Sequence, residues 1–163
     1  MKSLLNKIQN SKGCILSPPK GVPKVKDPYV LPADMMEFYK LCGGIKFFEG
    51  SDYEIEIVSP EKVQLSNPVI LPEEWKTDIA SDDISNGWYI IAEAGPEQRV
   101  SIDLNRKRLG KCYDSFWDIH ASPGECPVIA KSFTVLIEKI FNANGGYWFW
   151  LSDDFESLGD AYG

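Results

Sequence analysis

The segment LPADMMEFYKLCGG, Leu31 to Gly44, predicts the helix on which the rest of the fold depends. Proline is tolerated in the first turn of a helix, and a glycine just past the end accepts the left-handed cap conformation. Pro32 and Gly43 therefore bracket a predicted helix of roughly three turns. Its apolar residues recur at helical spacing: Met35, Phe38, Tyr39 and Cys42. Such a stripe must pack on a larger apolar surface.

Two further helices are predicted, one at each end of the chain. A short amphipathic helix is indicated by Leu4, Leu5 and Ile8. The other covers IAKSFTVLIEKIFNANGG, where apolar residues keep helical spacing from Ile129 to Phe141 and Asn144-Gly145-Gly146 end the helix.

The middle of the chain is typical of strands. IKFFEG and YEIEIV form one predicted pair, and WYIIAEA, QRVSIDL and LGKCYDS follow, joined by the turns AGPE and NRKRLG. Polar and apolar residues alternate in YEIEIV, which predicts that one face of the sheet is wet, and in QRVSIDL, which predicts a clear core face for the middle strand. The order of elements predicts an α+β fold, with a mainly antiparallel sheet and helices packed on one side.

A single domain is expected over residues 1–163. Residues 11–31 are predicted to be a proline-rich extended connection, since SPPKGVPKVKDPYVLP carries five prolines. Residues 147–163 form a C-terminal extension that is first aromatic and then acidic, in which Ser152 is predicted to cap a short last helix.

The chain is acidic, with 24 Asp and Glu against 17 Lys and Arg and a net charge of −7. Phosphate binding depends on clustered cations, so direct nucleic-acid binding is not expected. A basic protein partner fits better, although the charge alone also serves to keep a small domain soluble. No signal-peptide or membrane-spanning pattern is found, and a cytoplasmic location is expected. Four irregularly spaced cysteines and one histidine predict buried, reduced thiols and no metal or cofactor.

No catalytic constellation is indicated, and we expect a protein without enzymatic activity. The one histidine, His120, lies in the aromatic-rich stretch FWDIH and is predicted to be a packed or hydrogen-bonded ring. The carboxylate pairs Asp82-Asp83 and Asp153-Asp154 are typical of helix starts and wet surfaces.

Partner binding is predicted instead at the acidic stretch 73–83. Its five carboxylates face a single Lys76, and its members are Glu73, Glu74, Asp78, Asp82 and Asp83. Trp75 lies within this stretch, and Tyr53 is flanked by acids. Both are predicted as apolar anchors that would meet a basic partner, the alternative being that they belong to the core.

Three places in the chain resemble the SUKH superfamily, the domain named after the Smi- and Knr-type yeast cell-wall regulators. They are LPADMMEFYKLCGG, the strand pair WYIIAEA and VSIDL, and LGKCYDSFWDIH followed by VIAKSFTVLIEKI, together spanning about residues 31–141. Many relatives carry a Gly-Asp step between the two central strands, where this chain has AGPEQRV. A role tied to that aspartate is therefore not carried over.

The resemblance implies a non-enzymatic α+β domain that binds proteins. In bacteria such domains are mainly immunity proteins, which neutralise a cognate toxin, often a nuclease. An acidic chain would suit a basic toxin of this kind. The alternative is a regulatory scaffold like the eukaryotic relatives, which bind signalling proteins without neutralising them.

Overall fold

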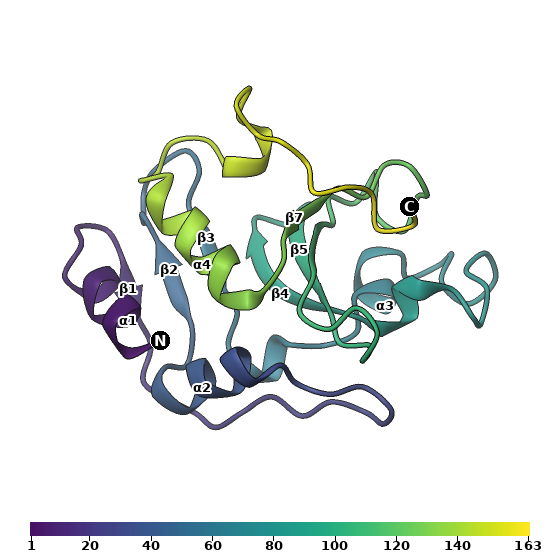
Figure 1. Ribbon diagram of the computed structural model, residues 1–163, viewed down its shortest axis with the longest axis horizontal. Coiled ribbons are helices and arrows are strands. Elements are labelled where there is room, and N and C mark those ends of the chain that lie inside the picture. The colour runs from purple at the N-terminus through teal and green to yellow at the C-terminus, as the bar shows by residue number, and fades with distance from the viewer.

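A seven-stranded antiparallel sheet lies at the centre of the computed structural model, which describes residues 1–163 (Figure 1). The strands neighbour one another in chain order: β1 Ile15–Leu16, β2 Ile45–Phe47, β3 Ile55–Ile57, β4 Trp88–Ala94, β5 Gln98–Asp103, β6 Cys112–Asp114 and β7 Val128–Ala130. The helices are α1 Lys2–Gln9, α2 Ala33–Leu41, α3 Ser66–Ile70 and α4 Phe133–Asn142, with 3-10 turns η1 Pro60–Lys62, η2 Ile84–Gly87 and η3 Phe149–Leu151. The predicted α+β class is confirmed.

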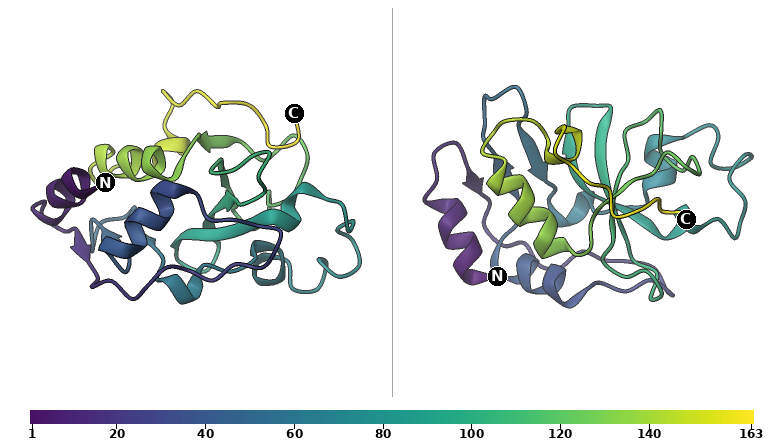
Figure 2. Two further views of the ribbon diagram at one scale, coloured as in Figure 1. Left: turned by 60° about the horizontal axis from the view of Figure 1, so that its bottom comes forward. Right: turned by 45° about the horizontal axis from the view of Figure 1, so that its top comes forward.

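The main core lies between the sheet and the three longer helices α1, α2 and α4, which Figure 2 shows from two sides. The predicted stripe of α2 is buried, and the ring of Phe38 packs edge-on against Phe133 of α4, with centroids 5.0 Å apart. Asp34 ties the same two helices together, because its Oδ2 accepts hydrogen bonds from the backbone N and the Oγ1 of Thr134 at 2.8 and 2.9 Å. A carboxylate at a helix N-terminus also complements the helix dipole.

The paired glycines after α2 differ from the prediction. The helix ends at an extended Cys42, and Gly43 does not adopt the left-handed cap conformation. Gly43 is required for a different reason: a Cβ at this position would lie 2.1 Å from the carbonyl oxygen of Pro18. Gly44 has φ +138, and its Cβ would lie 2.8 Å from the carbonyl oxygen of Ile57. The glycines thus let two other segments of backbone approach.

The C-terminal helix begins later than predicted. Residues 128–130 form β7, paired with β6, and α4 starts at Phe133, after Ser132, whose Oγ accepts from the N of Val135 at 3.2 Å. Helical spacing from Ile129 was accidental, since a short apolar run fits a buried strand equally well. Ser152 likewise follows the last short turn, η3, and does not cap a helix.

The second face of the sheet is covered over β4 to β7, contrary to the prediction of a wet face. Ser101 and Asp103 of β5 point away from the main core, yet both are 0% exposed. The segment between β6 and β7, α3 and the C-terminal residues cover this side, where Trp88 and Tyr113 form part of a second, smaller core. Water reaches the corresponding face near β2 and β3, where Lys46 is exposed.

The proline-rich connection contains one short strand. Residues 17–32 contain neither helix nor strand, but the two residues of β1 lie within the predicted range 11–31 and add an edge strand beside β2. Their hydrogen bonds to the sheet explain why this end of the connection is regular.

Candidate functional site

Residues 73–83, called the acidic loop from here on, connect α3 to η2 and extend to the right in Figure 1. They form successive turns, with hydrogen bonds from the N of Trp75 to the O of Leu71 at 3.0 Å and from the N of Asp78 to the O of Glu74 at 2.7 Å. The loop therefore has defined local structure although it contains neither helix nor strand.

Four of its carboxylates face water and have no basic partner: Glu73, Glu74, Asp78 and Asp82. The one polar contact among their side chains is local, since Oδ1 of Asp78 accepts from the hydroxyl of Thr77 at 2.9 Å. Trp75 is half-buried between them. The loop presents concentrated, unneutralised negative charge next to one large aromatic side chain.

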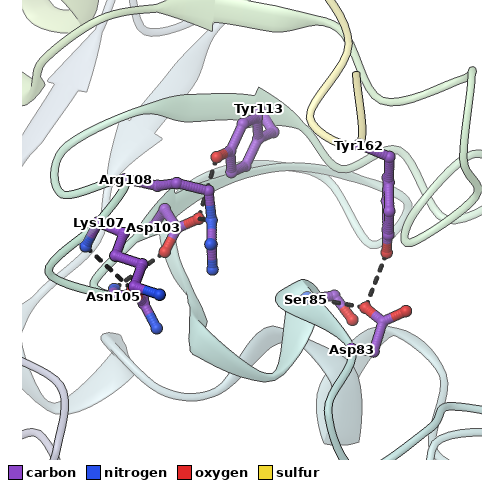
Figure 3. Close-up of polar contacts among 8 residues, drawn as sticks. All are labelled: Asp83, Ser85, Asp103, Asn105, Lys107, Arg108, Tyr113 and Tyr162. Carbon is purple, nitrogen blue, oxygen red and sulfur yellow. Dashed lines mark hydrogen bonds and ion pairs between the residues drawn. The ribbon is translucent and has the colours of Figure 1, made fainter.

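Asp83 has a different environment from the other four acids. Its Oδ1 accepts from the N of Ser85 and from the hydroxyl of Tyr162, each at 2.8 Å (Figure 3). Burial raises the pKa of Tyr162, and the neighbouring Asp83 carboxylate raises it further. Asp83 thus caps η2 and holds the C-terminal segment, so the sequence-based grouping with the four exposed acids does not match its contacts.

Tyr53 does not lie with the acidic loop. It belongs to the β2–β3 connection at the opposite end of the sheet in Figure 1, and its ring packs on Tyr147 and Trp148 with centroids 4.9 and 5.5 Å away. Contacts between aromatic residues so far apart in the chain leave no local sequence signal. The seven predicted residues therefore occupy two separate regions.

A buried polar network that the sequence did not predict holds the base of the acidic loop. Nδ2 of Asn67 donates to Oγ of Ser85 at 2.9 Å and to Oδ1 of Asn86 at 3.3 Å, joining the two ends of the loop. Nδ2 of Asn86 in turn donates to the carbonyl oxygens of Ala80 and Ser81 at 2.9 and 3.3 Å. The bond between Asn67 and Ser85 is buried, while those of Asn86 lie nearer the surface. Satisfied buried hydrogen bonds fix geometry, so the loop has a rigid base.

His120 connects this base to the sheet. The side-chain nitrogen of Asn67 donates to Ser85, and its Oδ1 accepts from Nε2 of His120 at 2.8 Å. Nδ1 lies 3.0 Å from Oγ of Ser115, which is 2.6 Å from Oγ of Ser101 on β5. The ring is 3% exposed, and burial lowers the pKa of His120 to about 4. His120 is thus a neutral, doubly hydrogen-bonded residue.

The remaining reactive side chains are also buried. All four cysteines are unpaired and buried, and burial raises the pKa of the Cys126 thiol to about 11, against the opposing effect of hydrogen bonds to backbone. No three side chains of His, Cys, Asp or Glu are arranged to hold a metal ion. None of the helices combines the length and apolar character that crossing a bilayer requires.

The sequence of the chain is similar to a bacterial protein and matches the model of a protein family. It is 45% identical over 159 residues to "Immunity protein YokJ" of Bacillus subtilis (strain 168), an alignment that covers 98% of this chain and 93% of that protein. No solved structure matches the chain. The model of the SMI1 / KNR4 family (SUKH-1) matches residues 28–139, from the proline-rich connection through most of α4. The chain therefore belongs to the SMI1 / KNR4 family (SUKH-1).

Proposed function

We propose that the chain is an immunity protein, which binds a cognate toxin in the cytoplasm and blocks it by occlusion, without catalysis of its own. The observation that carries the proposal is the 45% identity, over almost the whole chain, to a protein named an immunity protein. The same observation favours immunity over the scaffold role of the yeast regulators. Four unpaired, buried thiols agree with a reducing compartment.

The acidic loop is the proposed contact surface for basic residues of the toxin. Its exposed acids Glu73, Glu74, Asp78 and Asp82 have no internal partner, so no ion pair must break before they meet a cation. The rigid base of the loop lowers the entropy lost on binding. Trp75, half-buried at its centre, would supply the apolar anchor.

Expression with the toxin gene next to this chain's own gene tests the function. Cells that express the toxin should survive when the chain is present, and the two proteins should copurify. Death of the cells despite stable expression of the chain would contradict the proposal.

Charge reversal tests the contact surface. Replacing the four exposed acids of the loop by lysine should weaken toxin binding by more than about tenfold and reduce its dependence on salt. The matched control reverses four exposed acids that have no ion pair and lie outside the loop: Glu97, Glu138, Asp153 and Glu156. Equal losses in the two variants would mean that net charge, and not this loop, governs binding.

A further inference from the structure

A cationic groove lies between the β5–β6 turn, β7 and the C-terminal segment. Its volume is ≈ 380 Å³. Five cations line it, with no carboxylate among the lining residues: Arg106, Lys107, Arg108, Lys111 and Lys131. Two leucines, Leu109 and Leu158, complete its rim and are 38% and 42% exposed. Nearly a third of the chain's 17 basic residues thus converge on one place in a protein of net charge −7.

The turn that carries most of these cations is held rigid by a buried carboxylate. Asp103, 0% exposed, accepts from the N of Asn105 at 2.9 Å, from Nε of Arg108 at 2.8 Å and from the hydroxyl of Tyr113 at 3.0 Å (Figure 3). Oδ1 of Asn105 then accepts from the N of Lys107 at 3.0 Å. The backbone of the turn and the side chain of Arg108 are therefore held in place before any partner arrives.

Four of the five cations are left without a partner in the chain. Arg108 makes the one ion pair of the group, with Asp103, while Arg106, Lys107, Lys111 and Lys131 are exposed and unpaired. Like charges held close together repel one another, and none of the chain's 24 acids forms an ion pair with these four cations. An anionic ligand would remove this repulsion.

The leucines distinguish between possible anions. A nucleic-acid backbone offers phosphates along an extended track and gains most of its affinity from a broadly basic protein. Here the groove is short, the whole chain is acidic, and two exposed leucines flank the cations. We propose that the groove docks a segment of a protein partner in which acidic residues alternate with apolar ones.

The groove and the acidic loop open at the same end of the sheet. β4 begins where β5 ends, with Trp88 opposite Asp103. η2, which follows the acidic loop, ends at Gly87. The carbonyl oxygen of Gly87 accepts from the N of Leu104 at 3.0 Å, and Asn105 lies against Gly87, so the start of the β5–β6 turn lies beside the end of η2. This inference rests on the proposed function, which identifies the partner as the toxin. It adds that the toxin presents a basic patch and, beside it, an acidic and apolar segment.

A peptide titration tests the groove without the toxin. A short peptide of alternating glutamate and leucine, added to the full ¹⁵N-labelled chain, should shift the amides of Lys107, Arg108 and Gly110. A variant with Lys107→Glu and Lys131→Glu should bind it more than about tenfold less tightly. The control variant, Lys7→Glu with Lys12→Glu, has the same charge change at exposed, unpaired lysines near α1 and should bind like the parent chain.

Other outcomes overturn the inference. If inorganic phosphate or a short single-stranded RNA shifts the same amides at a concentration equal to or lower than that of the peptide, the groove is a phosphate site. If the parent chain dimerises and the variant with Lys107→Glu and Lys131→Glu does not, the groove binds a second copy of the chain. If the peptide shifts none of these amides, the groove does not bind an acidic and apolar segment and the proposal is wrong.

Toxin binding provides the second readout. Lys107→Glu with Lys131→Glu should weaken binding of the neighbouring toxin by about tenfold or more, and unchanged affinity would exclude the groove from the toxin interface. Failure of the parent chain itself to bind that toxin would contradict the proposed function, while the peptide titration would still decide whether the groove binds an acidic segment.

Discussion

Replacing His120 by glutamine should change how the stability of the protein depends on pH. The pKa of His120 is lowered from 6.5 to about 4, chiefly by burial, against the opposing effect of Asp83 and with a smaller contribution from Arg99. Between these two pH values the unfolded chain binds a proton that the folded chain excludes. The free energy of unfolding therefore falls as the pH falls from 6.5 to 4.

The size of this effect follows from the difference between the two pKa values. Each unit is worth about 1.4 kcal/mol, so the full contribution is about 3 kcal/mol, and about 2 kcal/mol is already lost at pH 5. Glutamine carries no titrating group. At pH 7.5 the variant should be about 1–3 kcal/mol less stable than the parent chain, because its side chain cannot keep both hydrogen bonds of the ring, to Asn67 and Ser115.

Urea unfolding followed by tryptophan fluorescence, at several pH values from 7.5 to 5, measures both proteins. The stability difference between them should shrink by about 2 kcal/mol over this range. Asp114, whose pKa burial raises, titrates in both proteins and cancels in the difference. Parallel stability curves would refute the reasoning, since they would mean that His120 takes up its proton equally in the folded and unfolded chains.

Two substitutions test how the main core and its helices are joined. Gly43→Ala should destabilise the protein by about 3 kcal/mol in urea unfolding. The new methyl group would lie 2.1 Å from the carbonyl oxygen of Pro18, so the backbone must move. A loss below about 1 kcal/mol would contradict this close approach. Asp34→Ala should lower the free energy of unfolding by about 2 kcal/mol, since Thr134 loses a charged acceptor for its N and Oγ1. Asp34→Asn keeps one acceptor oxygen and should lower it by less. Equal losses in the two variants would argue against this contact.

The site could be predicted from sequence only in part. Exposure of Glu73, Glu74, Asp78 and Asp82 agrees with the expectation for acids concentrated in a stretch with turn signals. The cationic groove could not be predicted from sequence because its cations come from different segments. The NRKRLG turn is a local feature of the chain, but Lys131 joins it only through the pairing of β6 with β7.

The sequence by itself determined the elements whose signals are local. Apolar residues at helical spacing specified α2 and most of α4, since a helix must turn one stripe toward the core. Gly95 and Gly110, both at positive φ, marked the turns that order β4, β5 and β6 into a meander. The resemblance to the SUKH superfamily rested on the order of these same elements, and the family model and the relative then showed membership.

Only the tertiary structure decided what depends on distant partners. Residues 128–130 are a strand because β6 offers its free edge, and Asp83 is a cap and tether because Tyr162 reaches it from the end of the chain. His120 is neutral because burial lowers its pKa, and Asn67 and Ser115 hold its two ring nitrogens by hydrogen bonds. In each case the deciding energy comes from desolvation and from contacts between residues far apart in the chain, which no local pattern records.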